Sequence, residues 1–182
     1  MRSRFLPEGR LLHTPENEAA CASRDGLRRA MEEGTVLEGV AQLCDGAHNL
    51  LVSVGPFTGF LPREEAALGI AEGTTREIAI LSRVGKPVCF QITALEESGG
   101  VLRPRLSRRR AQQAALDAML AGLHPGCILP AVVTHLESFG AFVDIGCGVP
   151  SLIGIESISV SRIPHPDQRF RVGQAIFAVV QE

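Results

Sequence analysis

Residues 126–159 read GCILPAVVTHLESFGAFVDIGCGVPSLIGIESIS and contain three short aliphatic runs separated by glycine and proline. Short runs rich in β-branched and aliphatic residues, bounded by such residues, are typical of strands. The three runs cover residues 126–136, 139–146 and 149–154, and RVGQAIFAVVQE at residues 171–182 predicts a fourth strand. This part of the chain is therefore predicted to be a small β domain.

The same order of elements occurs earlier in the chain, over residues 34–106. TVLEGVAQL (35–43), NLLVSVG (49–55) and PFTGFLP (56–62) are strand-like, as are two runs within residues 76–95, broken near Gly85, and VLRPRLS (101–107). The landmarks repeat in order: Gly34 matches Gly126, and the Arg-Val-Gly run at 83–85 matches the one at 171–173. Two copies of short strands with glycine at the corners predict two small barrels, of which the second supplies only four strands.

Two segments are predicted to be helical. TPENEAACASRDGLRRAMEEG (14–34) has Thr14 or Asn17 as a candidate N-cap, Pro15 at a first helical position and Gly34 at its end. Residues 107–121, SRRRAQQAALDAMLA, are strong helix formers and are followed by Gly122. The expected organisation is an N-terminal helical extension (1–33), a first barrel (34–106), a linker helix (107–122) and a second barrel (123–182). The second barrel lacks a fifth strand, so the sequence is expected to be a fragment.

The second copy resembles the S1-type RNA-binding domain, the family named after bacterial ribosomal protein S1. The resemblance lies in the Phe-Gly-Ala-Phe-Val-Asp run at 139–144, the Leu-Ile pair at 152–153 and the Val-Gly-Gln run at 172–174. The first copy, with GFLPREE (59–65) and LSRRRAQ (106–112), is similar to a divergent member. The resemblance implies a mainly β fold with helical segments, made of two tandem five-stranded OB-fold barrels with the second truncated. It also implies binding of single-stranded RNA and a role in translation.

Composition restricts the other classes of protein. The 182 residues are 45% hydrophobic with a net charge of −2, which supports a folded core and argues against a generally basic nucleic-acid coat. No apolar run approaches the ~18 residues of a membrane span, and the N-terminus does not resemble a secretory signal. Five cysteines, an odd number, favour free thiols in a reducing cytosol. We therefore expect a cytoplasmic protein without a membrane anchor.

The second copy carries candidate RNA-stacking residues. Alternation along residues 141–145 points three apolar side chains inward, so Phe142 and Asp144 point outward. An outward phenylalanine suits stacking on an unpaired base, although a neighbouring element could cover it instead. Phe139 lies in the preceding turn and extends the surface, and His135 on the first strand is a further candidate contact. The family often has histidine where this sequence has Gly154, which removes one expected contact.

Arginines supply the candidate phosphate contacts. The block RPRLSRRR at residues 103–110 lies between two acidic halves of the chain, and arginine offers a forked, permanently charged donor set. Cations at a helix start face the unfavourable end of the helix dipole, so they need a partner, either RNA or the acidic surfaces of the barrels. The candidates in this block are Arg103, Arg105, Arg108 and Arg109. Arg162, Arg169 and Arg171 are weaker candidates near the second barrel.

The first copy differs at the corresponding stacking positions. His48 stands in place of Phe139, Leu51 in place of Phe142, and Pro62 at the histidine position of the family. The first barrel is therefore expected to have lost its stacking surface and to serve as a docking or spacer domain.

No enzyme motif is complete, and we predict a non-catalytic protein without cofactor or metal. Gly146-Cys-Gly148 lacks the third glycine of a dinucleotide fingerprint, and no cysteine–histidine pair has a second pair at zinc spacing. The predicted function is single-stranded RNA binding, with mRNA and proteins of the small ribosomal subunit as partners. The alternative is a protein-interaction adaptor that binds no RNA. Salt distinguishes them, because RNA affinity falls steeply as salt rises.

Overall fold

Residues 5–181 are described in this computed structural model, and they belong to two compact units. Glu8–Ala114 forms the N-terminal unit, and Ala115–Glu182 with the residues up to Pro7 forms the C-terminal unit. The division lies within helix α4 (Arg108–Gly122), which occupies the stretch predicted to be a linker helix. Both units are mainly β, with helices added to each.

The N-terminal helical segment forms two helices instead of the single helix predicted. Helix α1 (Pro15–Cys21) is capped by Thr14, and α2 (Arg24–Glu33) begins after Ser23, whose hydroxyl accepts a hydrogen bond from the Gly26 N–H at 3.1 Å. The serine caps a new helix because its side-chain oxygen satisfies an amide left free at the helix start. Gly34 ends α2 in the left-handed conformation, as the sequence indicates.

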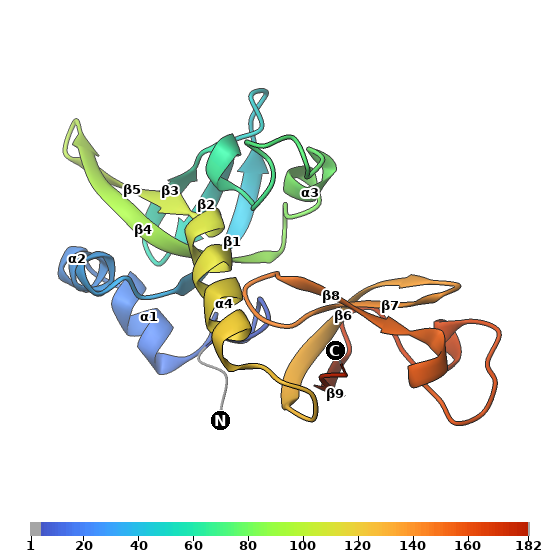
Figure 1. Ribbon diagram of the computed structural model, residues 1–182. Helices are drawn as coiled ribbons and strands as arrows, with labels where there is room; N and C mark the ends of the chain where they lie inside the picture. The colour runs from blue at the N-terminus through green and yellow to red at the C-terminus, as the bar shows by residue number, and fades with distance from the viewer. Residues whose placement is uncertain (1–4, 182) are drawn as a thin grey trace. The chain divides into compact units, whose positions relative to one another are not determined.

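The N-terminal unit contains a closed barrel of five strands (Figure 1). The strands are β1 (Leu37–Cys44), β2 (Leu50–Val54), β3 (Phe57–Leu61), β4 (Pro87–Ser98) and β5 (Val101–Ser107). They follow the order β1-β2-β3-β5-β4, in which β3 and β5 are parallel and close the barrel between antiparallel neighbours. This is the small barrel of an OB-like domain.

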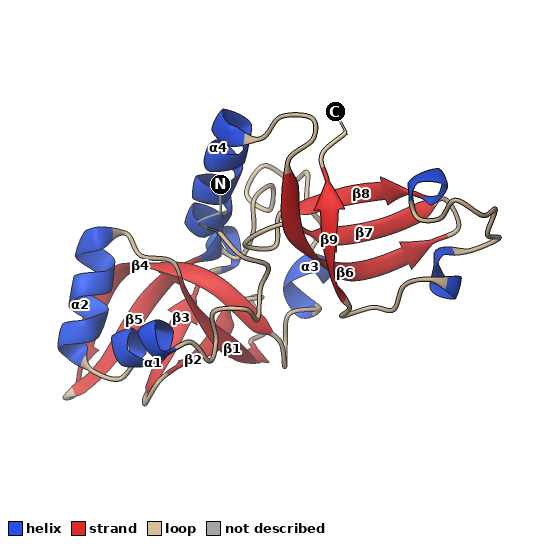
Figure 2. Cartoon of the chain, turned by 90° about the horizontal axis from the view of Figure 1, so that it is seen from below, coloured by secondary structure: helices blue, strands red, loops and turns tan. Residues whose placement is uncertain are grey.

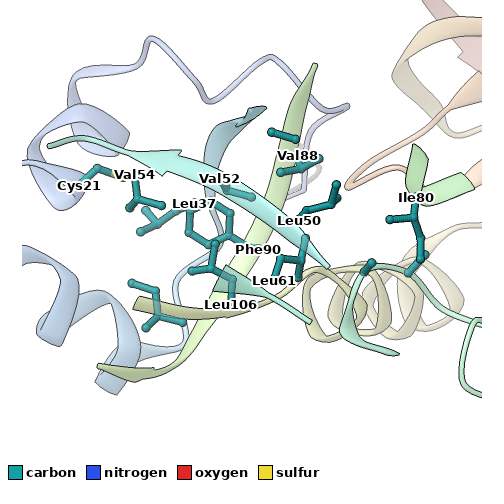
Figure 3. Close-up of a cluster of buried hydrophobic side chains, with 14 of the residues drawn as sticks. Cys21, Leu37, Leu50, Val52, Val54, Leu61, Ile80, Val88, Phe90 and Leu106 are labelled. Atoms are coloured by element: carbon teal, nitrogen blue, oxygen red, sulfur yellow. The ribbon is translucent and has the colours of Figure 1, made fainter. Parts of the chain in front are cut away.

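Strand alternation fills the barrel with aliphatic side chains and Phe90 (Figure 3). Leu50, Val52 and Val54 of β2 are fully buried, and the residues between them face outward. Gly59 of β3 faces inward, where an added Cβ would lie 2.6 Å from Leu106 Cδ1. The barrel closes at this point because glycine lets the two strands approach around the Leu106 side chain.

The segment between β3 and β4 contradicts the strand predicted near residues 76–84. It contains the 3-10 turn η1 (Arg63–Glu65) and the short helix α3 (Ile78–Leu81). Ser82 N–H donates to the Ile78 carbonyl at 2.9 Å, and Ile80 is buried while Ile78 is exposed. The β-branched residues that suggested a strand form a helical turn here because the five strands already close the barrel.

The C-terminal unit contains four antiparallel strands in the order β8-β7-β6-β9 (Figure 2). They are β6 (Ile128–Glu137), β7 (Gly140–Asp144), β8 (Pro150–Gly154) and β9 (Ala175–Val179), each at a stretch predicted as a strand, with β6 one residue longer at its end than predicted. The turns η2 (Ile155–Ser157) and η3 (Pro166–Gln168) lie between β8 and β9. The inner face of the sheet packs Ala131, Val133 and Val143 against aliphatic side chains and Phe170.

Two buried glutamates attach residues 8–14, the N-terminal strap, to the barrel. Glu8 accepts a hydrogen bond from the Cys89 N–H at 2.8 Å and one from Arg108 Nε at 3.0 Å. Glu38 of β1, which is only 1% exposed, accepts from the N–H groups of Gly9 (2.9 Å) and Leu12 (3.0 Å). The strap is therefore held by carboxylates that burial has removed from water.

The pKa values of Glu8 and Glu38 are shifted in opposite directions. Burial opposes ionisation of Glu8, but the Arg108 guanidinium holds the pKa of Glu8 below its ordinary value. Burial raises the pKa of Glu38 to about 7, and the charge of Glu8 adds to the rise against the opposing hydrogen bonds from the strap. Glu38 Oε1 has no hydrogen-bond partner among the residues that the structure describes.

A pH dependence of stability follows from Glu38. Because its pKa is raised on folding, its stabilising contribution is fully present below about pH 4.5 and is lost as pH rises through 7. We expect the free energy of unfolding to fall by on the order of 2–3 kcal/mol between about pH 5 and pH 8 through this group. Urea unfolding of the chain across this range measures the change.

Glu38→Gln serves as the comparison, since glutamine does not titrate. The variant is expected to lose most of this pH dependence, while every other titratable group is the same in both proteins. Parallel stability curves for the two proteins between pH 5 and 8 would contradict the assignment to Glu38.

Candidate nucleic-acid interface

The outer face of the C-terminal sheet carries a row of ring and aliphatic side chains. Phe142 of β7 lies directly between His135 of β6 and Leu152 of β8 in the strand register. The His135 and Phe142 ring centroids are 6.1 Å apart, and the Phe139 ring meets Phe142 edge-on at the same separation. We call these four residues the outer aromatic patch. The structure therefore brings together the three ring residues that the sequence singles out and adds Leu152, which the sequence analysis missed.

The strands hold the patch open to solvent. Phe139 is 53% exposed and Leu152 49% exposed, while Phe142 between them is half-buried. Their neighbours in sequence, Ala141 and Val143, are fully buried in the core of the unit. The His135 imidazole is exposed and lies 2.7 Å from the Glu137 carboxylate. An apolar ring surface with a polar rim is what base stacking requires.

Alternation predicts that Asp144 is exposed next to Phe142, and this prediction is wrong. Asp144 is buried, and its Oδ1 accepts hydrogen bonds from the N–H groups of Gly146 (2.8 Å) and Gly148 (3.0 Å). The carboxylate is buried because it satisfies the amides of the turn that leads into β8. The patch is therefore not flanked by the charge of Asp144 at its surface.

Gly154 leaves room for a different acid at the edge of the patch. An added Cβ at Gly154 would meet the carboxylate of Glu156, which folds back over the glycine. Gly154 pairs with Gly140 in the register, and the following N–H of Ile155 donates to the Phe139 carbonyl at 2.9 Å. A negative charge thus occupies the position where the resembled family often has histidine.

The arginines predicted near this unit are exposed. Arg162 and Arg171 are both on the surface, and Arg171 with Arg169 lines an open hollow of about 490 Å³. The turn that contains Arg171 is joined to β6, since the Gly173 N–H donates to the Val133 carbonyl at 2.7 Å. These cations are available to phosphates.

The arginine block of the N-terminal unit divides into two groups. Arg108 is buried and bound to Glu8, and its Nη1 donates to the Ala66 carbonyl at 3.1 Å. Arg109 lies near the carboxylates of Glu65 (3.5 Å) and Glu72 (3.8 Å). The structure does not support the predicted phosphate contact by Arg108, because the side chain is buried and its donors are taken up by Glu8 and Ala66. The sequence analysis considered RNA or acidic barrel surfaces as partners for these cations. In the structure, Arg108 and Arg109 contact acidic groups of the N-terminal unit.

The other two arginines of the block lie on strand β5. Arg103 is exposed, and Arg105 is half-buried with its Nη1 3.4 Å from Glu96 Oε1. Both side chains point to the outer face of the barrel, because Leu102, Pro104 and Leu106 between and beside them face the inside. These two arginines remain candidates for phosphate contacts.

Arg108→Ala tests the structural role of this residue. We expect a loss of about 3–5 kcal/mol in the free energy of unfolding, because buried Glu8 loses the guanidinium that hydrogen-bonds it and keeps only Arg83, whose Nη2 lies 3.8 Å from Glu8 Oε1. Thermal and urea unfolding measure the change. Arg110→Ala is the matched control, since Arg110 is an exposed arginine two positions along the same helix and is expected to change stability by less than about 0.5 kcal/mol. Equal effects of the two substitutions would contradict the assignment.

Among residues 5–181, no cluster of three or more histidine, cysteine or acidic side chains could hold a metal ion. Within the same residues, no helix has the length and apolar character needed to cross a membrane. None of the five cysteines, all of which lie in this range, forms a disulfide, and three of them are buried.

The geometry defines an OB-like β protein with an exposed ring surface suited to stacking. The profile of the family described as S1 RNA binding domain matches residues 123–182, the part of the chain that carries the outer aromatic patch. The small ribosomal subunit protein bS1 of Neisseria meningitidis is 28% identical over 160 residues, which cover 85% of this chain and 26% of that protein. Protein tex of Bordetella pertussis is 35% identical over 101 residues, which cover 55% of this chain and 12% of that protein.

Residues 123–182 are thus an S1 domain, and the chain as a whole is similar to bS1 proteins, so the resemblance inferred for the second copy is confirmed. The chain spans about a quarter of the length of the meningococcal relative. A crystal structure of a multidomain protein with nucleic acid binding domains from Streptococcus pneumoniae aligns with 80% of this chain and 46% of its own, with 16% identity and a TM-score of 0.29.

Proposed function

We propose that the chain is a non-catalytic protein that binds single-stranded RNA through the outer aromatic patch. The observation that carries this proposal is the position of Phe142, an apolar ring held on the outer face of an S1 domain between His135 and Leu152. A ring in this position points away from the core behind it and offers a π-face to an unpaired base. Arg162, Arg169 and Arg171 are exposed donors for the phosphates.

We further propose that the RNA is mRNA and that the protein acts in translation in the cytoplasm, with proteins of the small ribosomal subunit as partners. The similarity to bS1 proteins over most of this chain supports the proposal. Protein tex, whose name does not describe a ribosomal protein, is also similar to part of this chain. RNA binding and ribosome binding therefore need separate tests. Co-sedimentation of the chain with purified small subunits, with and without RNase treatment, makes that test.

Phe142→Ala is expected to weaken RNA binding by about tenfold, since stacking of one base is worth about 1–3 kcal/mol. Fluorescence anisotropy with an unstructured oligouridine measures the affinity at several salt concentrations. Phe177→Ala is the matched control: Phe177 is an exposed phenylalanine of β9 that pairs with Pro130, near the opposite end of β6 from His135.

The salt series separates RNA binding from the adaptor alternative. A logarithm of the association constant that falls linearly with the logarithm of salt concentration indicates release of counterions from phosphates. Absence of binding at low salt, or equal losses in the Phe142 and Phe177 variants, would overturn RNA recognition by the outer aromatic patch.

Gly154→His is expected to tighten RNA binding severalfold. The backbone of Gly154, with φ −60° and ψ 147°, accepts any side chain, and the flexible Glu156 side chain can move aside. The substitution moves a negative charge away from the patch and adds a ring beside Phe139. Glu156→Gln separates the two effects, since it removes only the charge. Weaker binding by both variants in the same anisotropy assay would show that Glu156 belongs to the RNA site.

A further inference from the structure

The N-terminal strap is held on the barrel by two anchors of different kinds. Residues 8–13 form turns, without helix or strand, so hydrogen bonds to side chains attach them. Glu8, the first residue of the strap, is bound to the Arg108 guanidinium. Glu38 of β1 accepts hydrogen bonds from two backbone amides further along the strap. The strap thus has one anchor at its first residue and a second one after it.

The first anchor is a buried charge with a counter-ion. Arg108 donates to both carboxylate oxygens of Glu8, and Arg83 Nη2 lies 3.8 Å from the same group. The Cys89 N–H adds a hydrogen bond of 2.8 Å. Because the guanidinium holds the pKa of Glu8 below its ordinary value, this anchor keeps its charge between pH 5 and 8.

The second anchor is a buried charge without a counter-ion whenever Glu38 is ionised. Its Oε2 accepts both strap amides, and its Oε1 has no hydrogen-bond partner among the described residues. Within residues 5–181, no ion pair reaches this carboxylate. The charged and titratable side chains packed around it are Glu8 and His13 of the strap, Glu18 and Cys21 of α1, Cys89 of β4, Arg83 before β4, and Arg108 of α4. These surroundings favour the neutral acid.

The attached strap therefore prefers protonated Glu38. The strap amides lower the pKa of Glu38, but burial and the charge of Glu8 raise it, and the resulting pKa is about 7. When the strap leaves the barrel, water reaches the carboxylate and its pKa returns to the ordinary value of 4.5. A hollow of about 370 Å³, lined by Glu38 together with Leu12 and Asn17, gives that water a route. A rise in pH thus favours the detached strap.

We propose that residues 9–13 are a pH-operated latch, which is closed on the barrel while Glu38 is protonated and opens locally when Glu38 ionises, with the Glu8–Arg108 pair as its fixed end. The latch consists of turns, whereas the barrel beneath it is closed by five strands, so the latch can detach while the barrel stays folded. The device belongs to the N-terminal unit and does not depend on RNA binding.

The difference in proton affinity sets the size of the effect. The closed latch is stabilised by protonated Glu38 below about pH 4.5, and this stabilisation is lost as pH rises through 7. Between about pH 5.5 and about pH 8.5, the equilibrium constant for opening is expected to rise about thirtyfold.

Hydrogen exchange of the full chain, followed by mass spectrometry, measures this opening in peptides covering residues 9–13 and 87–92. Labelling times are scaled for the intrinsic rise of exchange with pH, and each series is run with and without a low concentration of urea. We expect residues 9–13 to lose protection about thirtyfold with little dependence on urea, because local opening exposes little surface. Residues 87–92, which lie in β4, should exchange more slowly and depend more steeply on urea. Equal rates and urea slopes in the two peptides would mean that the whole barrel unfolds, and would overturn the latch.

Two variants identify the titrating group. Glu38→Gln keeps an oxygen acceptor for the strap but does not ionise, so protection of residues 9–13 should be the same at both pH values. His13→Gln tests the competing explanation, because histidine also changes charge in this range and His13 lies 3.8 Å from Glu18. Such an exposed pair contributes little, so His13→Gln should keep the thirtyfold response. A response that disappears in His13→Gln would refute the role of Glu38. This result is decisive even if Glu38→Gln does not fold.

The fixed end has a separate readout. Residues up to Pro7 belong to the C-terminal unit, in which the Leu6 carbonyl accepts from the Cys147 N–H at 2.9 Å. A peptide covering residues 145–149 should therefore keep its protection while residues 9–13 open. Loss of protection in both peptides at high pH would show that the strap detaches from its first residue, and would overturn the assignment of Glu8 as the fixed end.

Discussion

The pleat of the strands is the constraint on which the rest of this protein depends. Each short strand must fill a small core with every second residue, and this requirement assigns the residues between to the surface. In β7 the core takes Ala141 and Val143, and in β3 it takes Gly59 and Leu61. Phe142 and Phe60 reach the outer faces because their neighbours are committed to the inside. The outward position of these two rings therefore follows from the same alternation that fills the core of each unit.

Much of the fold could be predicted from the sequence because strands and helix ends leave local signals. The Thr14 cap, the Gly34 helix end and the four strands of the C-terminal unit are all where the sequence places them. The segment around Ile78 was assigned wrongly as a strand, since β-branched residues also occur in a helical turn that packs one face on a core. Local pattern alone cannot tell these cases apart, because the closure of the barrel decides between them.

The candidate sites show the same division between local and long-range information. Phe142 was found from alternation, but Arg108 was misjudged because its partner, Glu8, is 100 residues away. Asp144 was expected at the surface, and the turn amides that bury it are visible only in three dimensions.

The attachment of Glu8 to Arg108 also sets an order of events during synthesis. Because these partners are 100 residues apart, the first residues of the N-terminal unit leave the ribosome long before the arginine that binds them. Until the start of α4 emerges, Glu8 lacks Arg108 as its partner. The barrel cannot close before its last strand, β5, which directly precedes α4 in the sequence, has also emerged. Closure of the barrel and attachment of the strap therefore become possible within a few residues of each other, late in the translation of this unit.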